Sequence, residues 1–251
     1  MCEFFSIVSD PTNFKILYCN ANDRAMFKSG ELGIDSCDSH SSIAKMFGYT
    51  GKQEDRLNKY EYNPLTRKFI VDQINNEVDD SAEIEKFCNR LDFKTIVPEL
   101  ILKPVVHPFR DVVPPVEITE VHLALLREWN SVWNSVSVWN SVWNSIRDSV
   151  GNSVWNSIRD SVWNSVWDSV GNSVWDSVGR SVGNSVWDSV GAYIGSFFKL
   201  DKWEGVEHKV GEYPFQSAVD LWNLGLVPSF DGKVYRLHGG KEGKVLWEGK
   251  I

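Results

Sequence analysis

A strict tetrapeptide repeat constrains this chain more than any other feature of its sequence. The chain reads Trp-Asn-Ser-Val from Trp129, loses two residues at Val136-Ser137-Val138, and then repeats in units of four without a break to Ile194. In each unit a-b-c-d, position d is Val or Ile, c is Ser through Ser189, b is nearly always Asn or Asp, and a is Trp, Arg or Gly. A period this regular predicts a repeat architecture in which each unit mainly contacts its neighbours.

An extended backbone suits this period better than an α-helix does. Side chains alternate along a strand, so a repeat of four keeps a and c on one face and b and d on the other. Four helical residues overshoot a full turn by ~40°, so a Val stripe would wind around a helix. Trp, Asn, Ser and Val are also poor helix formers. The two-residue defect preserves strand parity but swings a helical stripe by ~200°. We therefore predict a tetrapeptide-repeat β-solenoid over residues 129–198.

Two other structures remain open for the repeat. Residues 119–129 have a helical pattern, with Thr119 as the cap and Val121, Leu125 and Leu126 at helical spacing. No breaker separates this pattern from the first repeat units, so packed long α-helices are the alternative to a solenoid. Disorder is the third reading of the segment, although disordered segments are poor in Val and Trp.

The sequence before the repeat is typical of a globular domain. Residues 1–112 predict an α+β domain large enough for its own core. Turns rich in Asp, Asn and Pro separate short apolar runs, which predicts two hairpins. The hairpin strands are residues 4–8 with 14–18, and 59–62 with 68–72. Helices are predicted at 22–29, at 39–47 and after Asp80.

The remaining parts of the chain are shorter. Residues 113–128 form a linker, marked by Pro114-Pro115, and the start of a helix. Residues 199–251 predict a small αββ cap. Its helix is expected at 215–224 and its two strands at 233–238 and 244–247. A repeat stack needs its open ends covered, and such a module would serve that purpose.

Position a of the repeat supplies the candidate binding residues. Trp, Arg and Gly differ widely in volume, and a close-packed interior does not accept that exchange without cavities or clashes. We therefore expect position a outside and the Ser and Val inside. An outward row of Trp with Arg predicts contact with a protein, a glycan or another copy of the chain. The alternative is that the Trp rings pack on one another or on the flanking domains. The candidate residues at position a are Trp139, Trp143, Trp155, Trp163, Trp167, Trp175, Trp187, Arg147 and Arg159, and Arg180 at position b joins them.

Charge and hydropathy limit the kinds of partner that this chain is expected to bind. The chain carries 26 Lys and Arg against 34 Asp and Glu, and the repeats contain three Arg and no Lys. A nucleic-acid groove needs concentrated positive charge, so we expect no nucleic-acid partner. No apolar run approaches the ~20 residues that span a bilayer, and the N-terminus lacks the basic region of a secretory signal. We expect no membrane partner and a location in the cytoplasm of a host cell or on a virion.

Cys2 is the candidate catalytic residue. Removal of Met1 would expose an N-terminal thiol whose own α-amine can act as its base. The start of the chain resembles N-terminal-nucleophile glutamine amidotransferases over Met1-Cys2 and the apolar run that follows. Glu3 stands where that family usually has Gly, and no glutamine-binding motif is evident. A partly buried structural Cys is the simpler interpretation of Cys2.

The stretch Cys37-Asp38-Ser39-His40 has the Cys-x-x-His spacing of half a zinc site. Tetrahedral zinc needs two further ligands, and the other cysteines, Cys2, Cys19 and Cys88, are scattered along the chain. A helix start capped by Asp38 or Ser39 explains the same residues more simply. We therefore predict neither a metal centre nor a cofactor, with Cys37 and His40 as the weaker zinc hypothesis.

Three stretches of the chain resemble a group of phage and metagenomic proteins. They are Met1-Cys2-Glu3-Phe4, the run from Asp38 to Ile43, and the run from Asn58 to Thr66. In that group a similar N-terminal domain precedes Ser/Val-rich tracts of variable length. The resemblance implies a phage origin and brings no known activity or catalytic residues. We expect a non-enzymatic repeat protein that serves as a spacer or a binding surface; the alternative is an amidohydrolase that uses Cys2.

Overall fold

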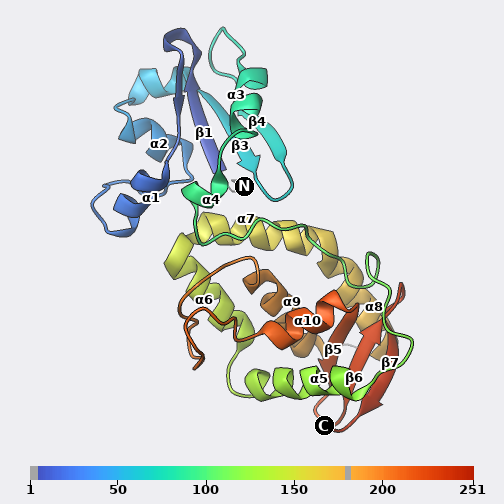
Figure 1. The fold of residues 1–251 in the computed structure, drawn as a ribbon. Coiled ribbons are helices and arrows are strands. Elements are labelled where there is room, and N and C mark those ends of the chain that lie inside the picture. Colours follow the sequence, from blue (N-terminus) through green and yellow to red (C-terminus); the bar gives the residue numbers. More distant parts are fainter. Residues whose placement is uncertain (1–4, 179–181) are drawn as a thin grey trace. The chain divides into compact units, whose positions relative to one another are not determined.

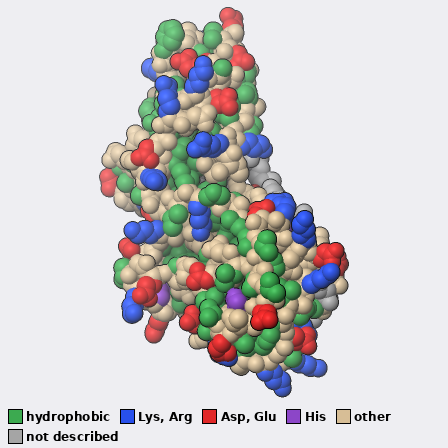
Figure 2. Space-filling view, turned by 45° about the vertical axis from the view of Figure 1, so that its right-hand side comes forward, with side chains coloured by type: hydrophobic (Ala, Val, Ile, Leu, Met, Phe, Trp, Pro, Cys, Tyr) green, Lys and Arg blue, Asp and Glu red, His purple; other side chains and the backbone are tan. Residues whose placement is uncertain are grey.

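The computed structural model of the chain describes residues 5–178 and 182–251, except for the side chains of 152, 153, 157, 164, 167–169 and 177. The chain divides into two compact units (Figure 1). The first comprises Met1–Leu102 and Asn152–Ser157, and the second comprises Lys103–Gly151 and Ile158–Ile251. Figure 2 shows Lys and Arg interspersed with Asp and Glu over the visible face.

The first unit is built on a four-stranded antiparallel sheet in the order β2-β1-β3-β4. Its strands are β1 (Phe5–Asp10), β2 (Lys15–Leu17), β3 (Asn58–Asn63) and β4 (Lys68–Gln73). Every residue of β1 is buried. The register pairs Phe5 with Tyr62, and both rings pack on Phe93, at centroid distances of 5.0 and 5.7 Å. Aromatic residues therefore form much of this core.

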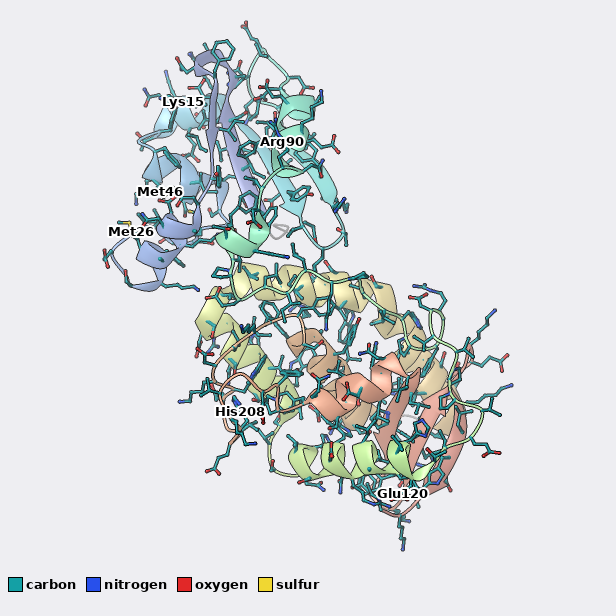
Figure 3. All side chains as sticks on the ribbon, in the orientation of Figure 1. Lys15, Met26, Met46, Arg90, Glu120 and His208 are labelled. Carbon is teal, nitrogen blue, oxygen red and sulfur yellow. The ribbon has the colours of Figure 1, made fainter. Side chains whose placement is uncertain are left out.

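Short helices pack around this sheet. They are α1 (Ala21–Lys28), α2 (His40–Met46), α3 (Ser81–Cys88), α4 (Phe93–Ile96) and two 3-10 helices, Pro11–Asn13 and Gly51–Arg56. The Asn20 side chain caps α1 and that of Ser39 caps α2, because both accept backbone N–H groups of the first turn. Met46 (Figure 3) ends α2 and packs against the buried cluster that contains Cys19 and Ile43.

The repeat segment is helical, so the prediction of a β-solenoid is wrong. Helices of 11 to 14 residues follow one another through the segment. They are α5 (Glu120–Trp133), α6 (Val138–Val150), α7 (Asn152–Val162), α8 (Asp168–Val178) and α9 (Gly183–Gly195), with a π-helical turn at Trp163–Trp167. Within the described residues, no helix is both long and apolar enough to cross a membrane.

Frequent breaks reconcile the four-residue period with helices. Each of α6 to α9 carries only three or four d positions, so the stripe drifts by ~80–120° before the helix ends, which fits one apolar face. Position d is buried at 0–8% exposure in nearly every unit. The residues are Val138, Val142, Ile146, Val150, Val154, Ile158, Val162, Val166, Val170, Val174, Val182, Val186, Val190 and Ile194. The expectation that position d faces the interior is confirmed, within a different secondary structure. The same expectation for Ser at position c holds only in part, since Ser141 and Ser189 are buried and Ser137 is exposed.

The breaks have identifiable local causes. The two-residue defect falls between the end of α5 at Trp133 and the start of α6 at Val138. Because no helix runs through these residues, the shift in the repeat does not interrupt the apolar stripe of either helix. Gly151 separates α6 from α7 with φ 93° and ψ 164°, a backbone conformation that is essentially restricted to glycine. In the π-helical turn each hydrogen bond spans five residues, so four residues make less than a full turn. In an α-helix four residues make more than a full turn, so the π-helical turn shifts the Val stripe in the opposite direction.

The C-terminal residues belong to the same unit as most of the repeat helices. They form α10 (Gln216–Asn223) and a three-stranded antiparallel sheet, β5 (Leu226–Phe230), β6 (Tyr235–Gly239) and β7 (Lys244–Gly249). The prediction of an αββ cap is therefore corrected by one strand, β5. Pro228 concealed this strand in the sequence, because proline is tolerated only at sheet edges and β5 lies at one.

Candidate functional site

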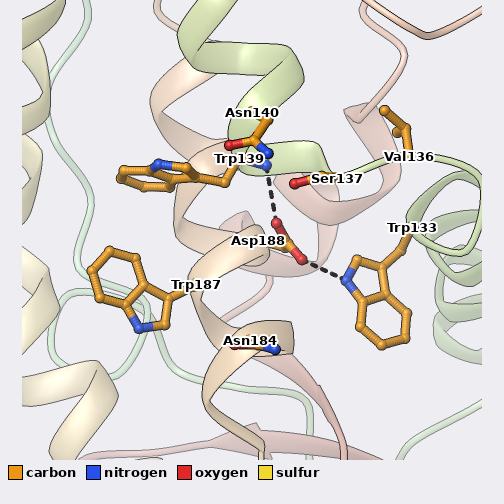
Figure 4. Close-up of a pocket in the computed structure, with 8 residues that line it drawn as sticks. All are labelled: Trp133, Val136, Ser137, Trp139, Asn140, Asn184, Trp187 and Asp188. Carbon is orange, nitrogen blue, oxygen red and sulfur yellow. Dashed lines mark hydrogen bonds between the residues drawn. The ribbon is translucent and has the colours of Figure 1, made fainter.

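A surface cavity of about 530 Å³ opens where the end of α5, the start of α6 and the middle of α9 meet (Figure 4). Three indole rings, three neutral polar side chains, one valine and one carboxylate line it. These residues are Trp133, Val136, Ser137, Trp139, Asn140, Asn184, Trp187 and Asp188. Its volume falls within the range of small-molecule binding sites.

Asp188 connects the three helices at this cavity. Its Oδ2 atom accepts the indole Nε1–H of Trp133 at 2.7 Å, and its Oδ1 atom accepts the backbone N–H of Trp139 at 3.0 Å (Figure 4). Burial raises the pKa of Asp188 above its ordinary value, and the two hydrogen bonds oppose that rise. Trp139 is the second residue of α6, so Asp188 caps that helix from across the cavity.

Ser137 is released from capping by this arrangement. It occupies the N-cap position of α6, where Ser normally accepts a backbone N–H with its hydroxyl. Its side chain makes no cap hydrogen bond, since Asp188 accepts the N–H of Trp139. The exposed Ser137 hydroxyl therefore lines the cavity without a capping role.

Trp139 and Trp187 also belong to a cluster of indole rings with Trp163. The ring of Trp139 lies edge-on to Trp187 at 5.2 Å and to Trp163 at 6.2 Å, and Trp163 lies 4.5 Å from Trp187. All three side chains are half-buried. The alternative that the tryptophans pack on one another therefore describes these three, and the same rings remain partly open to solvent.

Glycine at position a of one helix makes room for tryptophan at position a of another. A Cβ atom on Gly191 of α9 would lie 3.1 Å from Cε3 of the Trp139 ring, closer than ordinary van der Waals contact. The volumes of Gly191 and Trp139 are therefore matched across these two helices. The exchange of Trp for Gly at position a is thus compatible with close packing where a neighbouring helix compensates for the volume.

The other candidate binding residues that the structure describes are not among those that line this cavity. Trp143 is 36% exposed and carries the guanidinium of Arg147 over its ring at 5.0 Å. Trp155 is buried, Trp175 is half-buried on α8, and Arg159 pairs with Asp160 at 2.8 Å. The side chain of Trp167 and all of Arg180 lie outside the described residues.

Two important residues of the cavity were absent from the candidates. Trp133 stands at position a of an early unit, before the defect, and the row of tryptophans could have been extended to include it. Asp188 gives no such signal, because its unit Trp-Asp-Ser-Val is identical to the one that contains Asp176. Asp176 is exposed, whereas Asp188 is half-buried.

In the first unit, Cys37 and His40 have separate partners. The Cys37 and Cys19 thiols are both buried and interact with each other, which lowers the pKa of Cys37 and raises that of Cys19. The His40 Nε2 atom lies 3.0 Å from the carbonyl oxygen of Tyr60, and burial lowers the pKa of His40. Among the residues that the structure describes, no group of three or more His, Cys, Asp or Glu could hold a metal ion. Cys2 lies outside the described residues.

His40 takes part in a buried polar network instead. Its Nε2 atom is 3.3 Å from Glu61 Oε1 and its Nδ1 atom is 3.6 Å from Asp72 Oδ2. Glu61 in turn accepts the hydroxyl of Ser6 at 3.2 Å. Ser6 and Glu61 are only 0% and 4% exposed, so this network ties α2 to the sheet, with Asp72 at its exposed end.

Comparison of the chain with protein families, curated proteins and solved structures finds no match in any of the three. The resemblance to phage and metagenomic proteins therefore stays a prediction.

Proposed function

We propose that this chain is a non-enzymatic binding protein whose site is the cavity between α5, α6 and α9. One observation carries the proposal: half-buried indole rings from three separate parts of the chain surround a single open cavity together with hydrogen-bonding side chains. Tryptophan offers a large rigid surface at a low cost in conformational entropy, which is why it is enriched at binding sites.

The lining residues favour binding over catalysis. Asp188 is the only titratable residue among the eight, and both of its oxygen atoms already accept N–H groups of the protein. A hydrolytic or transfer site needs a nucleophile hydrogen-bonded to a base, and among the described residues no hydrogen bond joins the Ser137 hydroxyl to the Asp188 carboxylate. The resemblance to phage proteins supports action in the cytoplasm of a host cell or on a virion.

Trp139 and Trp143 provide a matched test. Both stand at position a on the same helix, one repeat apart, and only Trp139 lines the cavity. The indole N–H resonances of the full chain are followed by NMR while neutral oligosaccharides, oligolysine and oligogalacturonate are titrated separately. We expect at least one probe to shift the Trp133 and Trp187 resonances saturably, with binding lost in Trp139→Ala and kept in Trp143→Ala.

Two outcomes would overturn the proposal. One is that no probe of any of the three classes shifts these resonances. The other is that both variants bind equally well, which would locate the interaction outside the cavity. The variant Trp139→Phe retains an aromatic ring and serves if the alanine variant does not fold.

A further inference from the structure

The geometry points to a neutral saccharide as the ligand of this cavity. This inference rests on the proposed binding function and specifies the chemistry of the ligand. It is carried by the hydrogen-bonding groups at the cavity, by the local distribution of charge and by the indole faces.

The cavity presents polar groups that the fold does not use. The side chains of Ser137, Asn140 and Asn184 are all exposed, and none of the three has a hydrogen-bond partner among the described residues. A hydroxyl and two amides supply donors and acceptors together. Sugar hydroxyls are likewise both donors and acceptors, so neighbouring hydroxyls of one ring match such a set.

The charges at the cavity disfavour ionic ligands. An anion would approach the carboxylate of Asp188, and no Lys or Arg lines the cavity to offset that repulsion. A cation would approach the N-terminus of α6, which carries the positive end of the helix dipole. The one carboxylate nearby already accepts two N–H groups. A neutral ligand meets neither penalty.

The indoles supply the apolar part of the recognition. Trp133, Trp139 and Trp187 are each half-buried, so part of each ring system faces solvent at the cavity. A sugar ring has one face of C–H groups that packs on an aromatic surface while its hydroxyls point to polar neighbours. The eight lining residues provide both kinds of contact within one cavity.

The test uses the full chain and isothermal titration with neutral hexasaccharides of glucose, in α-1,4 and β-1,4 linkage, and of N-acetylglucosamine. Hexalysine and hexagalacturonate represent cationic and anionic ligands. We expect one of the neutral saccharides to bind. We expect Asn140→Ala and Ser137→Ala each to weaken that binding by about 3- to 10-fold, the loss of one hydrogen bond.

Asn144→Ala is the control, because Asn144 has the same place in the next repeat and bonds to Glu204 instead of lining the cavity. Its saccharide affinity should equal that of the parent chain. Binding of hexalysine or hexagalacturonate through Trp139, without binding of a neutral saccharide, would overturn this inference and leave the proposed function standing. Saccharide binding that is insensitive to Ser137→Ala, Asn140→Ala and Asn184→Ala would also overturn it.

Discussion

The two units of this chain build their cores in opposite ways. In the first unit each core position has its own residue type, such as Phe5, Tyr62 and Phe93, and buried charges are paired, as in Arg24 with Asp38. In the second unit the repeat helices bury the same Val or Ile every fourth residue, and their ion pairs lie nearer the surface, as in Arg147 with Asp148. A core with varied residue types favours one set of contacts. A core of identical Val and Ile residues does not, so its packing depends on where the helices break and on the non-repeat elements that pack against them.

The largest expected effect tests the difference between the ion pairs. Asp38→Ala leaves Arg24 buried without its partner, since their side chains are only 4% and 9% exposed. We expect the free energy of unfolding of the first unit to fall by about 3–5 kcal/mol. Urea denaturation with hydrogen-exchange detection measures it. In the control, Asp148→Ala, the loss should stay below about 0.5 kcal/mol; comparable losses in the two variants would remove the contrast.

The next prediction asks whether the uniform core is packed as tightly as the varied one. Ile7 in β1 and Ile146 in α6 are both fully buried. We expect Ile7→Ala and Ile146→Ala to cost about 3 kcal/mol each, because each removes buried methyl and methylene groups and leaves a cavity. Chemical denaturation of both variants provides the comparison. A cost for Ile146→Ala below about 1 kcal/mol would mean that the repeat core is loosely packed.

A pH dependence of about 2 kcal/mol is expected from His238 in the second unit. The ring lies between the hydroxyl of Ser229 at 2.8 Å and the carbonyl of Gly243 at 3.0 Å, and burial lowers its pKa from 6.5 to about 4. The unfolded chain therefore binds a proton before the folded chain does. Stability is retained above pH 6.5 and falls as the pH drops from 6.5 toward 4, by about 2 kcal/mol between pH 7 and 5.

Hydrogen exchange of the β6 amides across this pH range measures the effect. The variant His238→Asn should lose most of the slope, because it has no group that titrates in this interval. An unchanged slope in the variant would assign the pH dependence to other residues.

The smallest expected effect tests the glycine break. The tetrapeptide Gly-Asn-Ser-Val occurs at Gly151, where φ is 93°, and at Gly183, the first residue of α9. A Cβ atom meets nothing within 4 Å at Gly151, so Gly151→Ala isolates backbone strain, and we expect a loss of about 1–2 kcal/mol. Gly183→Ala should be neutral or slightly stabilising, since its Cβ also has room. Thermal unfolding of the two variants measures the difference. Equal effects would show that the backbone conformation at Gly151 does not make glycine necessary there.

Local sequence signals predicted much of the first unit. The hairpin strands at 4–8 with 14–18 and at 59–62 with 68–72 correspond to β1 with β2 and to β3 with β4. The helices predicted at 22–29 and 39–47 correspond to α1 and α2, because Asn20 and Ser39 are strong capping residues. Each of these elements carries its own start and stop signals.

The prediction of a β-solenoid is wrong because the repeat is divided among several short helices and is not one continuous element. A four-residue stripe does wind around an unbroken helix, and propensity does oppose that helix. The breaks at residues 134–137, at Gly151 and at the π-helical turn limit the drift, and tertiary burial of Val and Ile outweighs the propensity.

The sequence by itself determined that position d of the repeat faces inward in nearly every unit, since Val and Ile are buried whichever secondary structure forms. Tertiary structure alone decided which of several identical units build the cavity. Units with the same four residues have the same local preferences, so only distant neighbours distinguish them. Asp188 differs from Asp176 because the end of α5 and the start of α6 lie beside it, and no pattern within its own tetrapeptide records that contact.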